Sequence, residues 1–189
     1  MSPAPRIPGL QIFEPEAHED PRGRFVETFR ADDPRLHDLS GHPLTFVEDD
    51  LSFSRRGVLR GLHGDDRTWK LMQCVAGELF LAVVDLRPGS PTYRRWNGAR
   101  LSAENHRQIL APPGCVNGHL VLEDAVLLYK QTAYYRGADH QIAVRWDDPA
   151  IGVEWPLDEI SAAPVLSDRD ASTPWLEASR SSGPDHEEA

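Results

Sequence analysis

The feature that most constrains this chain is the recurrence of short apolar runs separated by turn residues. Turn signals rich in proline, glycine or aspartate occur at residues 20–23, 87–91, 112–114 and 147–149. The run 77–86 is apolar on both faces, as in a buried central strand, and 124–135 is a second long candidate. Shorter strands are expected at residues 12–13, 24–29, 45–54, 69–75, 99–101, 107–111, 120–122 and 141–145. About ten strands with turns every ~8–12 residues predict an all-β antiparallel sandwich or barrel.

The length of 189 residues fits one domain, since domains usually contain ~100–200 residues. We expect residues 1–170 to form this domain and residues 171–189 to form a polar, loose C-terminal tail, whose Trp175 and Leu176 could dock onto the domain. Helical periodicity is poor, and the best helix candidate is the short stretch from Asp33 to Leu39.

Charge and composition exclude several classes of partner. The net charge of −10 argues against a nucleic-acid surface, so an anionic ligand would need a local basic pocket. No apolar run approaches the ~18 residues of a membrane span, and residues 1–9, with three prolines, do not resemble a signal peptide. Cys74 and Cys115 allow one disulfide, but free thiols and a cytoplasmic location are the default expectation.

Arg60 and His63, which lie next to Gly61 and Gly64, are candidate functional residues. His63 follows Gly61 and precedes Gly64, and glycines allow a ligand to approach closely, so His63 could act as a base at a barrel mouth. The alternative is a structural, hydrogen-bonded histidine. Arg60 could pair with a phosphate, or equally with a carboxylate of the protein.

Lys70 and Tyr129 each allow two interpretations. Lys70 lies on the strand face opposite Trp69, and an inward lysine is costly unless it meets an anion, so the outward orientation is the commoner one. Tyr129 ends an apolar run, where a tyrosine is usually part of the core. Its phenol could instead point into a cavity as a general acid.

Polar residues also follow the turn at 112–114 and lie near the C-terminus. Asn117 and His119 could lie at a barrel mouth or cap the turn. Asp168 and Asp170 could orient a histidine or form a solvated cluster. No metal-binding histidine spacing, nucleophile elbow, phosphate-binding loop or dinucleotide fingerprint occurs. The remaining functions for these residues are acid–base catalysis and simple ligand binding.

Taken in order, these segments resemble the dTDP-4-dehydrorhamnose 3,5-epimerase family from about Gly9 to Asp170. The matching motifs are at residues 20–27, 57–63, 70–71, 84–87, 90–93, 101–105, 129–130, 146–148, 155–156 and 166–170. The resemblance implies a cupin-type double-stranded β-helix (jelly roll) with short peripheral helices and a site without metal or cofactor. It also implies a homodimer in which the N-terminal strand of one subunit completes the sheet of its neighbour.

The resemblance assigns roles by position. It makes His63 the base, Asp170 its orienting carboxylate, Tyr129 the acid and Lys70 the residue that stabilises an enolate oxygen. It makes Arg60 a diphosphate contact, lets Arg22 and Glu27 reach the nucleotide or sugar partly across the dimer, and puts Tyr135 near the substrate. The remaining substrate-binding candidates are Glu48, Asp50, Asn117, His119 and Arg169.

The chain also departs from the rhamnose enzymes, which usually have a histidine at Asn117, an aromatic at His119, amides at Glu48 and Asp50, and an acid at Gln141. Together with the residues around His63 and Lys70, these differences resemble the branch acting on GDP-4-keto-6-deoxy-heptoses. The expected function is therefore epimerisation of an NDP-4-keto-6-deoxy sugar, GDP-heptose or dTDP-hexose, at C3, C5 or both. The alternatives are a 3,4-ketoisomerase, for which the His63/His119 pair would be needed, and a non-catalytic sugar-binding protein.

Overall fold

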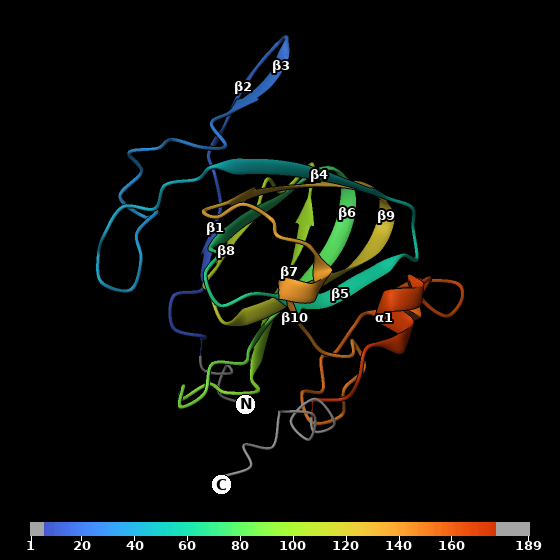
Figure 1. The fold of residues 1–189 in the computed structure, drawn as a ribbon. Helices are drawn as coiled ribbons and strands as arrows, with labels where there is room; N and C mark the ends of the chain where they lie inside the picture. Colours follow the sequence, from blue (N-terminus) through green and yellow to red (C-terminus); the bar gives the residue numbers. More distant parts are fainter. Residues whose placement is uncertain (1–5, 177–189) are drawn as a thin grey trace, which may run out of the picture.

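Two long antiparallel strands, β6 (Lys70–Asp85) and β9 (Cys115–Gln131), organise the fold of this computed structural model, which describes residues 6–176 (Figure 1). The other strands are β1 (Gln11–Phe13), β2 (Ala17–Asp20), β3 (Gly23–Val26), β4 (Glu48–Ser54), β5 (Leu59–Gly64), β7 (Trp96–Ser102), β8 (Gln108–Ala111) and β10 (Ile142–Ala143). The helical elements are the 3-10 helices η1 (Ala138–His140) and η2 (Leu157–Glu159) and the short α-helix α1 (Asp168–Ser172). The all-β class with short peripheral helices is confirmed.

The main sheet has the order β1-β8-β6-β9-β5-β10, with β4 added to the second half of β9 and β7 to β6. All of these pairings are antiparallel. The first half of β9 pairs with β5 and the second half with β4, so both strands border the same interior space. Figure 1 shows the sheet wrapping around this space as a barrel.

Each long strand was expected as two strands, and the structure corrects this expectation. β6 continues through Val75-Ala76-Gly77, where the sequence suggested a break. Its register with β9 shifts in this region, and Gly77 has a positive φ of 68°. A Cβ at Gly77 would lie 2.0 Å from the carbonyl oxygen of Asp124, so only glycine allows the two strands to approach here. The glycine therefore bends one continuous strand instead of ending it.

The C-terminal half of β6 is buried on both faces, as its apolar run predicts. Leu79, Leu81 and Val83 belong to one apolar cluster, whereas Ala82 and Val84 belong to another. The second cluster is completed by the chain after β10, including Trp155 and Ile160. Burial on both faces explains why this strand shows no alternation of polar and apolar residues.

The C-terminal segment packs against the barrel at least as far as Leu176. The buried carboxylate of Asp148 accepts a hydrogen bond of 2.7 Å from the backbone N–H of Leu176. The Arg145 guanidinium lies 4.6 Å from the centre of the Trp175 ring. Part of the expected tail is thus attached, and residues 177–189 lie outside the described residues. The boundary at residue 170 stays a prediction.

The helix expected from Asp33 to Leu39 is wrong. The segment forms turns, with a bridge between His37 and Pro43. The carboxylate of Asp33 accepts a hydrogen bond of 2.9 Å from the N–H of Arg35, a local bond that competes with helix formation. Likewise, the strand expected at 24–29 ends at Val26.

The hairpin formed by β2 and β3 extends away from the barrel (Figure 1). Its turn is the Asp20–Gly23 signal, and Phe25 on β3 is 69% exposed. An Arg24–Glu104 ion pair of 2.8 Å ties the hairpin to the rest of the chain. Within residues 6–176, no helix is long and apolar enough to cross a membrane. Cys74 and Cys115 are both buried free thiols.

Candidate active site

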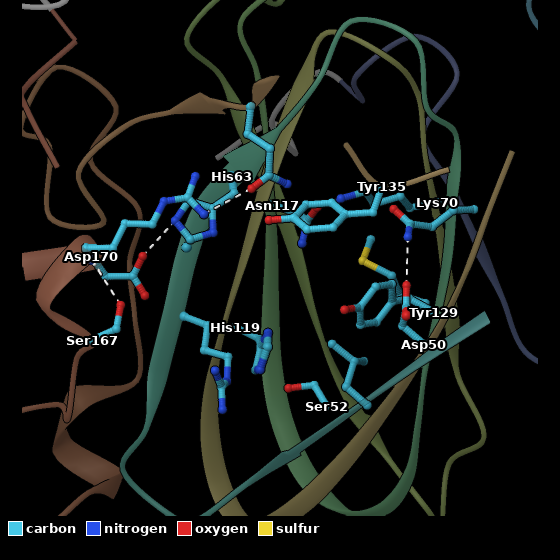
Figure 2. A pocket seen from close by; sticks show the side chains of 17 residues that line it. Asp50, Ser52, His63, Lys70, Asn117, His119, Tyr129, Tyr135, Ser167 and Asp170 are labelled. Atoms are coloured by element: carbon cyan, nitrogen blue, oxygen red, sulfur yellow. Dashed lines mark hydrogen bonds and ion pairs between the residues drawn. The ribbon is translucent and has the colours of Figure 1, made fainter. Parts of the chain in front are cut away.

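One cavity of about 470 Å³ opens between β4, β5, the first residues of β6, β9 and α1 (Figure 2). This volume falls within the range of ~300–1,000 Å³ that is typical of small-ligand sites. The lining residues are Asp50, Ser52, Arg60, Gly61, His63, Lys70, Met72, Asn117, His119, Leu127, Tyr129, Gln131, Tyr135, Gln141, Ser167, Arg169 and Asp170.

A bulge in β5 turns both Arg60 and His63 into the cavity. Residues three apart on a regular strand face opposite sides, yet both of these line the same space. The register with β9 shifts between them, so that Arg60 pairs with His119 and His63 with Asn117. The bulge contains Gly61, whose φ is 114° and whose Cβ would lie 2.6 Å from the Cα of Gly118.

His63 is held by a carboxylate from another element. Its Nε2 lies 2.6 Å from Oδ1 of Asp170 on α1. The hydroxyl of Ser167 caps α1 by accepting a hydrogen bond of 3.1 Å from the backbone N–H of Asp170. Burial raises the pKa of Asp170, but the contact with His63 and the hydrogen bonds from Ser167 and Gly61 together outweigh it, so the pKa lies below its usual value. Asp170 is therefore ionised at neutral pH and can fix the orientation of the imidazole.

Tyr129 and Lys70 lie on the other side of the cavity from His63 (Figure 2). Burial, together with the nearby Asp50, raises the pKa of Tyr129, so its phenol keeps its proton at neutral pH. Lys70 faces the cavity, against the outward orientation that its sequence context favours. Burial lowers the pKa of Lys70, and Asp65, Asp50 and Glu48 act against this shift.

Gln131 links the two acidic residues of β4. Its side-chain amide donates hydrogen bonds of 2.8 Å to both Glu48 and Asp50. The backbone N–H of Tyr135 lies 3.2 Å from Oε2 of Glu48 and donates to it. Asp50 lines the cavity. Glu48 does not, but it accepts hydrogen bonds from Gln131 and Tyr135, and these two residues line the cavity. This end of the cavity is therefore acidic and rigidly held.

Two arginines line the cavity without a carboxylate partner among residues 6–176. Arg60 Nε donates to the Ser54 hydroxyl at 3.0 Å. An Arg169 guanidinium N–H donates to the Gln141 amide oxygen at 3.1 Å. Most other arginines of this acidic chain pair with Asp or Glu. Guanidinium groups facing a cavity with neutral partners suit a phosphate-bearing ligand.

Comparison with known proteins identifies the family. The model of the dTDP-4-dehydrorhamnose 3,5-epimerase family matches residues 4–178. An enzyme of that name from Pseudomonas aeruginosa is 43% identical over 167 residues, covering 87% of this chain and 89% of its own. The chain belongs to the dTDP-4-dehydrorhamnose 3,5-epimerase family. It is a sugar-nucleotide epimerase, and thus an isomerase, as its sequence motifs predict.

Solved structures of epimerases agree with the fold. A dTDP-6-deoxy-D-glucose-3,5-epimerase from Legionella pneumophila, in complex with dTDP-4-keto-L-rhamnose, has a TM-score of 0.82 and 39% identity and covers 92% of this chain and 90% of its own. A 3'-monoepimerase from Streptomyces bikiniensis, in complex with dTDP-quinovose, has a TM-score of 0.83 and 34% identity. The match covers 93% of this chain and 87% of that enzyme. The cupin-type jelly roll expected from the sequence is confirmed.

In this epimerase, ten of the expected site residues line the cavity, and three do not: Glu48 lies just behind the lining, whereas Arg22 and Glu27 lie elsewhere. The Arg22 side chain is exposed in the β2–β3 turn and pairs with Asp20. Glu27 is exposed beyond β3, within 3.9 Å of Arg30. Neither lines the cavity within one protomer. Their expected contact with the ligand across a dimer stays a prediction.

The expected site residues omit several lining residues of the epimerase, among them Ser52, Met72, Leu127 and Gln131. Strand alternation could have found them. Ser52 is two residues from Asp50 on β4, and Met72 is two from Lys70 on β6. Leu127 and Gln131 flank Tyr129 at the same spacing on β9. Among residues 6–176, no group of three or more His, Cys, Asp or Glu side chains is placed to hold a metal ion.

Proposed function

We propose that the chain epimerises an NDP-4-keto-6-deoxy sugar at C3, C5 or both, without a cofactor. The observation that carries the proposal is that His63, held by Asp170, and Tyr129 line one cavity from different sides. Two titratable groups on either side of a sugar ring are what inversion of a carbon centre requires. A non-catalytic binding site would not need an ionised carboxylate against its histidine.

The chemistry follows from the ketone at C4, which acidifies the hydrogens on C3 and C5. His63 removes such a proton from one face of the ring as a general base, and the electron pair moves onto the C4 oxygen to give an enolate. The Lys70 ammonium stabilises this oxygen as its charge develops. Tyr129 then donates its phenolic proton to the opposite face of the carbon, which inverts the centre and restores the ketone. Proton exchange with water returns His63 and Tyr129 to their starting states.

Arg60 and Arg169 are the proposed contacts for the diphosphate. They supply the local positive charge that a chain of net charge −10 needs to bind an anion. We propose a dTDP-linked sugar as the first substrate to test, because the two solved relatives contain dTDP-linked sugars. A GDP-linked heptose is the second, because Glu48, Asp50 and His119 depart from the family pattern. A cytoplasmic location fits the two free thiols.

A homodimer is also part of the proposal. Leu51 and Phe53 alternate with the cavity-lining Asp50 and Ser52, so they face out of the barrel, where they are 54% and 69% exposed. Val75 on the neighbouring part of the sheet is 43% exposed. An exposed apolar face of this kind supports burial against a second copy. The protruding hairpin would then bring Arg22 and Glu27 to the site of the neighbouring subunit.

Proton NMR in D₂O tests the function. The protein is added to dTDP- and GDP-linked 4-keto-6-deoxy sugars, and loss of the C3 and C5 proton signals is followed. Exchange at both positions indicates a 3,5-epimerase, and exchange at C3 alone indicates a 3-epimerase. Appearance of a 3-keto product would identify a ketoisomerase instead. Binding of the sugar nucleotide without any exchange would contradict the proposed function.

A further inference from the structure

His119 is a buried histidine whose Nε2 has no hydrogen-bond partner in the part of the chain that the structure describes. Its side chain is 5% exposed and lines the cavity from β9. Nε2 is covered and makes no hydrogen bond to any of residues 6–176. Figure 2 shows the ring on the cavity wall near Ser52, in the half of the site away from Asn117 and Tyr135.

An unpaired buried imidazole destabilises the protein. A buried donor or acceptor without a partner has lost its bonds to water and gained nothing in return. An aromatic ring without nitrogens would fill the same place at no such cost. The presence of histidine here therefore points to a partner that arrives with the ligand.

The surroundings of His119 restrict the chemistry of that partner. Burial lowers the pKa of His119 to about 4, with a further contribution from the positive charge of Arg60, so the ring is neutral at pH 7. A neutral imidazole offers one donor and one acceptor, and a hydroxyl group can satisfy either. A phosphate oxygen can only accept a hydrogen bond from the ring, and its negative charge would favour the protonated imidazole. We therefore assign the phosphate contact to Arg60 and not to His119.

The position of His119 restricts the hydroxyl further. His119 is the direct cross-strand neighbour of Arg60, the proposed diphosphate contact. The diphosphate is attached to C1 of the sugar, so a group bound beside it belongs to a carbon next to C1. C2 is that carbon, and it is not one of the centres that react.

On this basis, which rests on the proposed function, we propose that His119 is a specificity-determining residue that hydrogen-bonds the C2 hydroxyl of the sugar nucleotide. The enzyme thereby selects sugars that keep this hydroxyl over 2-deoxy sugars. His119 takes no part in proton transfer and acts only on binding.

The test is calorimetric binding of unreactive 6-deoxyhexose nucleotides that have a hydroxyl at C4, compared with their 2-deoxy and 3-deoxy analogues. The wild type is expected to bind the 2-deoxy analogue about tenfold more weakly than the parent. His119→Phe is expected to bind both with the same affinity and, without ligand, to unfold about 2–4 °C higher. His119→Gln keeps a donor and an acceptor and is expected to restore part of the preference.

His37→Phe is the matched control, because Nδ1 of His37 is also buried without a partner but lies outside the cavity. It is expected to leave the preference for the C2 hydroxyl unchanged. The proposal is overturned if His119→Phe keeps the wild-type preference, or if the lost preference concerns the 3-deoxy analogue. Failure of the wild type to bind either dTDP- or GDP-linked parent sugars would instead contradict the proposed function.

Discussion

At the scale of single residues, the site depends on the contact between His63 and Asp170. The 2.6 Å distance between Nε2 of His63 and Oδ1 of Asp170 leaves the other ring nitrogen to face the ligand. An ionised carboxylate favours one tautomer of the neutral ring and stabilises the imidazolium that forms during proton abstraction. We therefore propose that Asp170 acts on the reaction through His63.

Replacing Asp170 by Asn tests this role. The amide keeps the size of the side chain but loses the charge that stabilises the imidazolium. We expect Asp170→Asn to lower kcat by about 10²-fold or more, with little change in KM. Steady-state kinetics measures the two constants, and Asp168→Asn, an exposed carboxylate on the same helix, serves as the control. A large rise in KM at unchanged kcat would show that Asp170 binds substrate instead.

His119 makes a separate prediction about stability and pH. Its pKa is about 4 in the folded protein and about 6.5 in the unfolded chain. Between these values the unfolded chain binds one proton more, so stability falls as the pH drops from about 6.5 to 4. The slope from this one group is about 1.4 kcal/mol per pH unit. Urea unfolding across this range should give a smaller slope for His119→Phe, and equal slopes would contradict the buried, neutral state of the ring.

At the scale of elements, the bulge in β5 decides which side chains reach the cavity. Gly61 combines a positive φ with a close approach to the backbone of β9, so any Cβ there would push β5 away from Asn117 and Gly118. This would move Arg60 and His63 away from their places on the cavity wall. The glycine is therefore required by the geometry of the site.

We expect Gly61→Ala to destabilise the protein by about 1–3 kcal/mol and to reduce activity beyond what the loss of stability explains. Gly57→Ala is the matched control, because Gly57 also has a positive φ, of 84°, but no atom lies within 4 Å of its Cβ position. Urea unfolding and the D₂O exchange assay measure the two effects. Similar losses in both variants would mean that backbone strain alone, and not the contact with β9, explains the effect.

The elements also show what the sequence could predict. Turn spacing and the apolar run 77–86 were sufficient to predict the all-β class and the buried C-terminal half of β6. The same sequence signals predicted two strands where β6 is one. A glycine such as Gly77 can mark either a turn that ends a strand or a bend within it. The sequence also suggested a helix at residues 33–39. The pattern of apolar residues does not reveal a side-chain hydrogen bond such as that of Asp33, which competes with helix formation.

The site was predicted mainly from the order of the motifs. Considered alone, Lys70 favours an outward orientation and His63 a structural role. Their meeting depends on which strands pair, and pairing between β5, β6 and β9 joins residues far apart in the chain. Arg22 and Glu27 do not line the cavity of this chain, and their expected contact with a neighbouring subunit stays a prediction.

At the scale of the whole molecule, the proposed dimer makes its own prediction. Wild-type protein is expected to sediment as a dimer, and Phe53→Asp to sediment as a monomer, because a charge in a buried apolar interface has no partner. Val165→Asp changes another exposed apolar residue and is expected to leave the dimer intact. Sedimentation velocity distinguishes the two states. A wild-type monomer that is fully active would contradict the expected contribution of the hairpin across subunits.

The central claim is that His63 and Tyr129 act on opposite faces of one sugar ring, and deuterium exchange tests it most directly. Each variant is incubated with the sugar nucleotide in D₂O, and NMR measures both exchange and inversion. We expect His63→Ala to show neither, and Tyr129→Phe to exchange protons at one face while inversion slows by about 10²-fold or more. Wild-type exchange in His63→Ala, or wild-type inversion in Tyr129→Phe, would contradict the mechanism.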